Sequence, residues 1–543
     1  MVFARRSTTL LAAIIASCAM VLSLTACTSD NKTVVDGQTT VTSNSAGGVA
    51  VFTPSDGITL NQQTPLNKWA KLVPDLAKAL ADAGFKKGDI DHTTSDSLDK
   101  QSRAIQDFVV DHLSNNTTDD SGIAIAPDNM TLLVAPVVEA DASTRQYGDY
   151  ISQNLSTNDA TDEGATSDGE SSEDDSSKDD SSNTESDSTA SDEQAQAVDR
   201  LVSSLKLAKE SGMHVVLLGN SIEGYKPDAF VKFSDAQTIG KLQAEKMVSK
   251  LKLDKASKDN PKYIEVLLPY TAVDEKGNAN DSTFAQEAFR GIWQVLGSYY
   301  QKGVVESPSG TLDGKSTEND WQAVAYDAAK EGSTAKVLDK RLAKTDGQST
   351  LTRIDGIITM NDYIASEVVK ELDDLGYTGS AADINPQITI SGIVGNITGK
   401  KDLSRDAVPD PIKSPENDNA NDSSSSDDDA DEDTSASDKD RDSQWPLVTG
   451  YGAHVSNIPS IVNGKQWMTG MEDRQTIATD IAQACAKLNK DEALNSMPSI
   501  RNSEVGGVKK IPTISEPLLA VSASNLKSAL IDPGYISLAD AGL

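Results

Sequence analysis

Polar side chains follow two short predicted strands near the C-terminus. The apolar run Trp445–Thr449 is too short for a helix and ends at Gly450, which predicts a strand buried on both faces. A short helix, a second strand at Gln466–Met471 and a long amphipathic helix follow. Strands that alternate with helices form a parallel sheet, which places ligands at the carboxyl ends of its strands. The loops Tyr451–His454 and Met471–Asp473 are therefore expected to point into one crevice.

Known catalytic motifs are absent from the sequence. It contains no Gly-x-Ser-x-Gly, no His-Glu-x-x-His and no Cys-x-x-Cys. Ser309–Ser316 nearly spells a phosphate-binding loop, but Ser309 occupies the first glycine position and no helix clearly begins at Lys315, so we expect an exposed turn. We expect no enzyme, no cofactor and no metal site, although carboxylate pairs of the glycosidase type can be recognised only in a fold.

The negative charge is concentrated in two segments. The chain has 543 residues and a formal net charge of -34. Ser156–Gln196 carries 14 acidic residues and one lysine, and Pro415–Asp442 carries 12 acidic and two basic residues, so together they account for 23 of the 34 excess negative charges. These Asp- and Ser-rich segments have too few apolar residues to offset the entropy of ordering, so disordered insertions are predicted over 156–196 and 400–443. The rest is only moderately acidic, and nucleic acid is not an expected partner.

The N-terminus resembles that of a bacterial lipoprotein. Residues 1–26 contain Arg5-Arg6 and an apolar run too short to span a membrane, which indicates a signal peptide. The run ends in Leu-Thr-Ala-Cys, which resembles the lipobox, so Cys27 is the predicted lipidation site and 27–47 a polar tether. The alternative is an ordinary signal peptide with an incidental Cys27. With Cys27 lipidated, Cys485 is the one remaining mature cysteine, and its place on an apolar helix face predicts a buried thiol.

Strands and helices alternate in two successive runs, which predicts an α/β protein of two Rossmann-like parallel-sheet lobes. We assign 48–234 plus 474–490 to the N-terminal lobe and 235–473 plus 491–543 to the C-terminal lobe. The expected helices include Ala197–Ser211 and Asp320–Leu342. Two apolar runs, Ile388–Ile393 and Trp445–Thr449, compete for the last strand of the second lobe, and Trp445–Thr449 is preferred because a helix and a strand follow it directly.

Two stretches carry a family resemblance. They are Gly450-Tyr451-Gly452-Ala453-His454 with the following Ser460–Gln466 and Glu472-Asp473, and Lys232–Val248 with Asp235 and Gly240. This pattern resembles sugar-binding lipoproteins of the periplasmic-binding-protein type I family, in the xylose- and multiple-sugar-binding branch. The resemblance implies two lobes joined by a three-strand hinge, with Asp235 and Asp473 at the hinge, although Asp235 could instead cap a helix.

The resemblance also implies ligand contacts. Lys68-Trp69 is similar to the Arg-Trp pair of the family, although Trp69 is equally consistent with a core position. Asn361-Asp362 is similar to its Asn-Asp pair at a strand end, although Asp362 could instead cap a helix. On this interpretation Asp362→Ala weakens ligand binding and leaves the protein folded.

The family pattern is broken at several contact positions. Gly219-Asn220 replaces Asp-Arg, Ala236 replaces Asn, Gly452 replaces an acid and Glu472 replaces Lys. Either the ligand differs from the usual sugar, or a new polar set serves it, or ligand binding is lost. The expected ligand-binding residues are Lys68, Trp69, Asn220, Asn361, Asp362, Tyr451, His454 and Glu472.

The resemblance implies an extracytoplasmic, lipid-anchored, monomeric solute-binding protein that closes on a sugar or similar ligand and works with an ABC permease. An alternative is a surface receptor that presents its ligand state to a sensor kinase or a cell-wall partner. A carbohydrate-acting hydrolase is a third possibility, with no motif behind it.

Overall fold

The computed structural model describes residues 46–55, 65–115, 125–138, 146–156, 185–272, 282–328, 330–343, 351–381 and 445–542, and the strands β1 (Lys32–Val35) and β2 (Gln38–Val41). Strands β1 and β2 pair antiparallel within a first unit, Met1–Ser45, and the chain from Ala46 onward forms a second unit. The segment expected to be a plain tether thus contains a hairpin. Cys27 lies outside the described residues.

The first lobe is built on a seven-stranded sheet in the order β17-β18-β9-β7-β5-β3-β4. Its strands are β3 (Gly48–Pro54), β4 (Ile90–Ser95), β5 (Met130–Val134), β7 (His214–Leu218), β9 (Ala229–Val231), β17 (Ile500–Val505) and β18 (Val508–Ile514). Only β17 and β18 are antiparallel to each other; every other neighbouring pair is parallel. The central strands are apolar on both faces, as a parallel sheet covered by helices requires.

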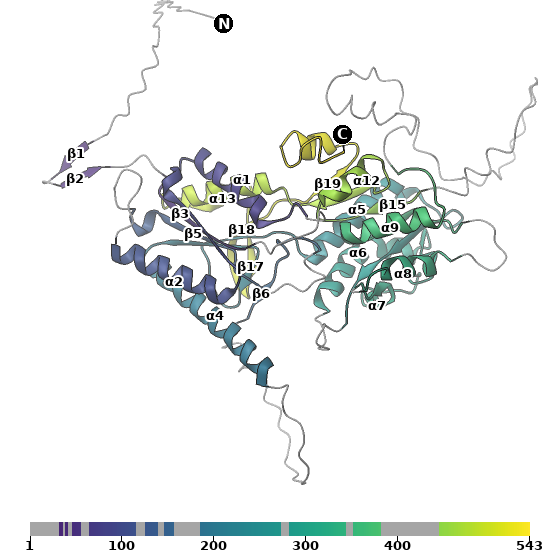
Figure 1. Ribbon diagram of the computed structural model, residues 1–543, viewed down its shortest axis with the longest axis horizontal. Helices are drawn as coiled ribbons and strands as arrows, with labels where there is room; N and C mark the ends of the chain where they lie inside the picture. Colours follow the sequence, from purple (N-terminus) through teal and green to yellow (C-terminus); the bar gives the residue numbers. More distant parts are fainter. Residues whose placement is uncertain are drawn as a thin grey trace, which may run out of the picture. The chain divides into compact units, whose positions relative to one another are not determined.

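Helices cover both faces of this sheet (Figure 1). Helices α1 (Trp69–Asp82) and α13 (Arg474–Leu488) pack on one face, and α2 (Leu98–Asn115) and α4 (Glu185–Glu210) pack on the other. Because α4 begins at Glu185, the predicted disordered insertion over 156–196 is wrong for its last part, while 157–184 lies outside the described residues.

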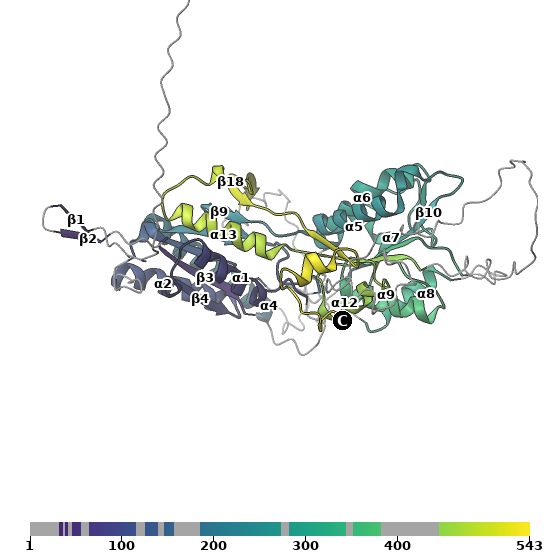
Figure 2. The same cartoon turned by 90° about the horizontal axis from the view of Figure 1, so that it is seen from above.

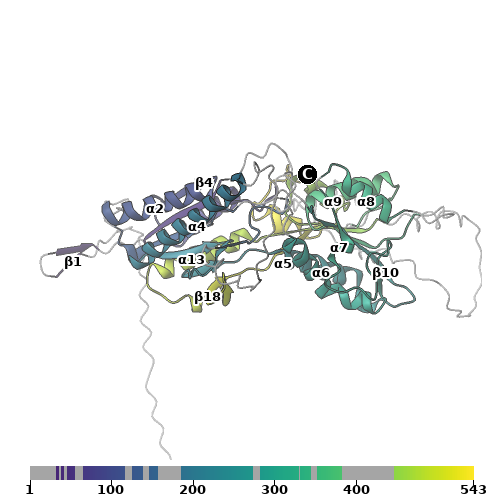
Figure 3. The ribbon, with the colours of Figure 1, turned by 90° about the horizontal axis from the view of Figure 1, so that it is seen from below.

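The second lobe has a four-stranded parallel sheet in the order β12-β10-β14-β15. The strands are β10 (Lys262–Val266), β12 (Val305–Glu306), β14 (Gly356–Ile358) and β15 (Leu447–Thr449). Helices α5 (Ala236–Leu251) and α6 (Thr283–Gln301) lie side by side on one face, and α8 (Ser333–Arg341) and α9 (Asp362–Asp374) lie on the other (Figures 2 and 3). The pairing of β14 with β15 confirms Trp445–Thr449 as the last strand of this sheet; Ile388–Ile393 and 400–443 lie outside the described residues.

The chain crosses between the lobes three times. It passes from β9 to α5, from β16 (Met468–Met471) to α13, and from β18 to β19 (Leu519–Ser522). Strands β16 and β19 pair antiparallel, and a parallel bridge from Tyr451 to Gly470 attaches them to the edge of the second sheet. The expected fold of two wound lobes joined by a three-strand hinge is thereby confirmed.

Two further sequence-based expectations are wrong. The segment 491–543 was assigned to the second lobe, but β17 and β18 pair with β9 in the first, so the last crossing comes only after Ile514. The predicted helix Asp320–Leu342 is broken into α7 (Trp321–Val324), β13 (Ala325–Tyr326) and α8. Apolar periodicity identifies an element but not the sheet that it joins, because pairing is a non-local choice.

Within the described parts of the chain, every helix is too short or too polar to span a lipid bilayer.

Candidate functional site

Lys68 is the N-cap residue of α1 and Trp69 is its first residue. The Nζ atom of Lys68 is 3.0 Å from Oδ1 of Asp149, and the backbone N–H of Trp69 donates to Oδ2 of the same carboxylate at 3.2 Å. The indole of Trp69 is buried and packs edge-on against Tyr150 and Phe233, with centroid distances of 5.0 and 5.7 Å. Trp69 therefore holds a core position, and Lys68 is already paired with an acid of its own chain.

Asn220 follows β7 and holds two loops of the first lobe. Its Nδ2 donates to the carbonyl of Pro136 and its Oδ1 accepts from the backbone N–H of Gln153, both at 2.9 Å. The side chain is buried. Because one donor and one acceptor of the amide are already used by backbone, Asn220 fixes the loop geometry around the site.

Asn361 and Asp362 follow β14 in the second lobe and have different roles. Asn361 caps α9, with Oδ1 accepting from Ile364 N at 2.9 Å, while its Nδ2 donates to Oε1 of Gln146 at 3.1 Å. The fully buried carboxylate of Asp362 accepts from Gln466 Nε2, Thr469 Oγ1 and His454 N at 2.7, 2.8 and 2.9 Å. The pKa of Asp362 is raised, because burial raises it by more than His454, Thr469 and Gln466 lower it. This carboxylate ties together the loops after β14 and β15.

Tyr451 and His454 lie in the loop after β15, as expected, and both are buried. The Tyr451 ring lies 6.3 Å from that of Tyr147, and its hydroxyl bonds to the hydroxyl of Ser234. Nε2 of His454 is 3.2 Å from the carbonyl oxygen of Gln146, which assigns its proton to Nε2. Burial lowers the pKa of His454, so the imidazole is neutral at pH 7.

Glu472 and the two predicted hinge residues lie at the crossings. Glu472 accepts from both the N–H and the hydroxyl of Ser234, and burial raises its pKa to about 7. Asp235 and Asp473 cap α5 and α13 by accepting from Thr238 N and Thr476 N. Asp235 thus has the helix-capping role that was one of its two expectations, and Asp473, expected only at the hinge, caps a helix as well.

Five of the eight predicted ligand residues meet one short piece of chain that sequence reasoning missed. We call Gln146–Ile151 the bridging segment. It contacts Lys68, Trp69, Asn361, Tyr451 and His454. The available signal was the pair of aromatic residues, Tyr147 and Tyr150, just before the Asp- and Ser-rich insertion.

Asn67 and His454, which contact the bridging segment from different lobes, each have a buried polar atom with no hydrogen-bond partner among the described residues. The atoms are Nδ2 of Asn67, from the first lobe, and Nδ1 of His454, from the second. Buried polar groups are normally paired with protein, water or ligand, so these atoms are candidates to pair with a polar ligand.

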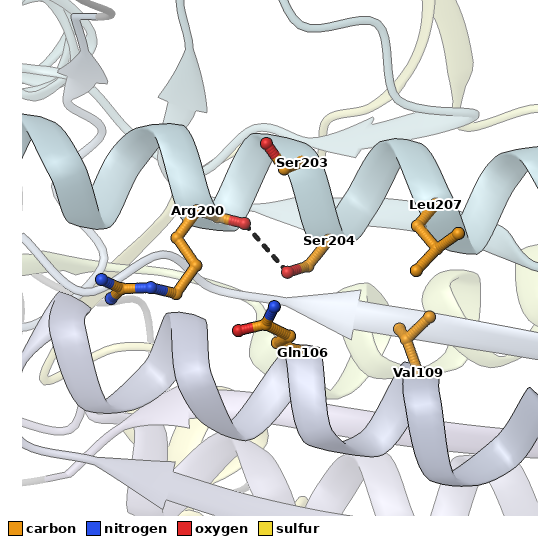
Figure 4. A pocket seen from close by; sticks show the side chains of 6 residues that line it. All are labelled: Gln106, Val109, Arg200, Ser203, Ser204 and Leu207. Carbon is orange, nitrogen blue, oxygen red and sulfur yellow. Dashed lines mark hydrogen bonds between the residues drawn. The ribbon is translucent and has the colours of Figure 1, made fainter. Parts of the chain in front are cut away.

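Two other features lie apart from this site. A groove of about 130 Å³ between α2 and α4 is lined by Gln106, Val109, Arg200, Ser203, Ser204 and Leu207 (Figure 4). None of the predicted site residues lines it. In the second lobe, the phosphate-loop-like sequence has no helix starting at Lys315, and its Ser309 N–H donates to the buried carboxylate of Glu265 at 2.8 Å. Among the described residues, no cluster of His, Cys, Asp and Glu could hold a metal ion.

No protein family model matches the sequence, and no curated protein does. Among solved structures, the chain is similar to an ABC transporter solute-binding protein from Clostridium phytofermentans with bound β-D-glucose, at 16% identity and a TM-score of 0.44, covering 91% of this chain and 99% of that one. A carbohydrate transporter solute-binding protein from Chloroflexus aurantiacus in complex with D-glucose has 18% identity and a TM-score of 0.42, covering 92% and 98%. The arabinose-binding protein AraP from Geobacillus stearothermophilus has 10% identity and a TM-score of 0.41, covering 89% and 99%. Likeness at this level does not assign a function to this chain.

Proposed function

We propose that this chain is the extracytoplasmic solute-binding protein of an ABC importer and that it binds a sugar or a similar polar ligand between its lobes. The observation that supports this most is that polar groups of both lobes converge at the carboxyl ends of their strands. Lys68 of the first lobe and Asn361 and His454 of the second lobe all contact the bridging segment. Contacts made to both lobes at once are what a ligand needs to stabilise a closed state.

The chemistry of the site fits a neutral, hydroxyl-rich ligand. The unpartnered Asn67 Nδ2 is a donor and the unpartnered His454 Nδ1 is an acceptor when the proton is on Nε2. A sugar hydroxyl both donates and accepts, so it satisfies either atom.

A thermal-shift screen of the whole chain tests the proposal. Pentoses, hexoses including D-glucose, small oligosaccharides and nucleosides are the probes. Binding to the folded state alone raises Tm with the logarithm of ligand concentration. Lys68→Met is expected to abolish the shift, and Lys100→Met, which removes an exposed ion pair on α2, is the matched control. The absence of a shift with every probe contradicts sugar binding.

The proposal includes anchoring through Cys27. Its basis is the Leu-Thr-Ala-Cys sequence at the end of the apolar N-terminal run. Cys27→Ser is expected to move the protein from the membrane to the soluble fraction of fractionated cells, because a chain without acyl groups has no such anchor. Retention of Cys27→Ser in membranes contradicts the lipid anchor.

A surface receptor that reports its ligand state to a sensor kinase or a cell-wall partner is the second candidate. It is favoured by the contacts that the predicted ligand groups already make within the chain, since Lys68 and Asn361 are engaged without a ligand. Uptake of a sugar that passes the thermal-shift screen separates the two candidates. Cells lacking the chain lose uptake if it serves an importer and keep uptake if it is a receptor.

A further inference from the structure

The bridging segment is held on one side by the first lobe. Asp149 accepts from Lys68 Nζ at 3.0 Å and from the N–H of Trp69 at 3.2 Å, and its own N–H donates to the carbonyl of Asn67 at 2.8 Å. The Tyr150 hydroxyl donates to the carbonyl of Lys68. The Asp149 carboxylate thus lies at the N-terminus of α1, where free N–H groups and the helix dipole favour a negative charge.

The same segment is held on its other side by the second lobe. Tyr147 is buried in the core of that lobe, with its ring 4.8 Å from Phe284. Gln146 accepts from Asn361 Nδ2 through its side chain and from His454 Nε2 through its carbonyl. Ile151 is buried in the second-lobe core as well. Within these six residues the anchored lobe therefore alternates. Gln146 and Tyr147 are held by the second lobe, Asp149 and Tyr150 by the first, and Ile151 by the second again.

Gly148 makes this alternation possible. Its φ of 104° is one that other residues rarely adopt, and a Cβ at this position would lie 2.6 Å from both the Cβ and the carbonyl oxygen of Asn67. The backbone passes directly over Asn67, close enough to leave no room for a side chain. The turn at Gly148 sends Tyr147 toward one lobe and Asp149 toward the other.

We propose that the bridging segment is an internal latch that ties the two lobes together without a ligand. It contacts both lobes at once, which is the condition for favouring a closed state, and it is covalently attached, so its effective concentration is always high. A molecule that binds the same groups must displace the latch. Evidence for the latch comes only from contacts within the chain. The molecule that displaces the latch need not be a sugar.

The distance between the lobes, measured without ligand, tests the latch. In the full chain with C18S and C27S, spin labels are attached at K78C on α1 and K370C on α9, two exposed positions on different lobes. Cys485 is fully buried and stays unlabelled. In the protein with the wild-type bridging segment, the distance between the two labels is expected to show one narrow distribution. Asp149→Ala and Tyr147→Ala, which release opposite anchors, are expected to shift and broaden it.

Asp228→Ala is a matched control. Asp228 pairs with Lys209 at 2.8 Å and accepts from Val215 N at 2.8 Å, with its side chain 26% exposed against 21% for Asp149, but it lies outside the bridging segment. It should leave the distribution unchanged. Asp149→Asn keeps the shape of the side chain and removes its charge. If this variant still unfolds cooperatively on heating, a shift in its distance distribution does not result from misfolding.

The outcomes are distinct from those of the sugar screen. An unchanged distribution in both Asp149→Ala and Tyr147→Ala overturns the latch, whatever the screen finds. A shift in these variants together with an unshifted Asp228→Ala supports the latch even when no sugar raises Tm.

Discussion

Glu472, in the second crossing, accepts hydrogen bonds from the backbone N–H of Ser234 at 2.7 Å and from the Ser234 hydroxyl, in the first crossing. The Tyr451 hydroxyl bonds to the same serine. Two of the three crossings are thus joined by one buried carboxyl group. Since hinge residues absorb the change in backbone angles during lobe closure, this contact restrains the element on which closure depends.

The protonation of Glu472 makes stability depend on pH. Burial raises its pKa from 4.5 to about 7. Below about pH 4.5 the carboxyl is protonated in both the folded and the unfolded state, and the folded state carries no penalty. As pH rises, the unfolded state loses its proton first, so stability falls until the folded state also ionises near pH 7. The difference corresponds to about 3 kcal/mol.

Glu472→Gln cannot ionise, so its unfolding free energy relative to the wild type should rise between pH 5 and pH 8 by up to about 3 kcal/mol. Urea unfolding at several pH values measures this. Glu245→Gln, an exposed change on α5, should follow the wild type. Parallel stability curves for Glu472→Gln and the wild type would show that Glu472 has no raised pKa.

Asp362→Ala should destabilise the protein strongly. The carboxylate is fully buried and accepts from Gln466 Nε2, Thr469 Oγ1 and His454 N, so its removal leaves three buried donors unpaired. The expected loss is about 3 kcal/mol or more. Asp374→Ala, at the exposed end of the same helix, should change stability by no more than about 0.5 kcal/mol. The resemblance alone predicts weaker ligand binding without unfolding, and a normally stable Asp362→Ala protein would favour that interpretation.

The contact between α5 and α6 depends on glycine. A Cβ at Gly291 would clash with the carbonyl oxygen of Gln237, which belongs to the facing helix. Both partners are backbone, so Gly291→Ala should move the helices apart and lower stability by about 2 kcal/mol or more. Gly314→Ala is the control, because a Cβ there meets its nearest neighbour, the Tyr300 carbonyl oxygen, at an ordinary 3.5 Å. Thermal unfolding with equal Tm values for the two variants would contradict this packing.

Cys485 should be unreactive in the folded protein. It is fully buried in the first-lobe core, and burial raises the pKa of its thiol, so almost no thiolate is present or accessible. Iodoacetamide followed by mass spectrometry of the Cys485 peptide should show modification only after unfolding in urea. Rapid alkylation under native conditions would mean that α13 opens readily.

Local patterns in the sequence predicted many of the elements but not all of their ends. The buried strand that starts at Met130, the helix cap of Asp235 and the buried thiol of Cys485 follow from short-range chemistry, because a cap or an apolar face is decided within one or two turns of chain. The two-lobed fold followed from the order of these elements.

The tertiary structure alone decided which residues and strands of the chain contact one another. It placed the strands ending at Ile514 in the first lobe, made Asp362 the buried tie between two loops, and brought Gln146 and Asp149 to Asn361 and Lys68. These contacts join residues 81 and 215 positions apart. No short-range pattern encodes them, since hydrogen bonding at such separations depends on how whole lobes pack. The sequence alone therefore predicted a set of candidate groups, and the packing decided that several of them are already bonded to their own chain.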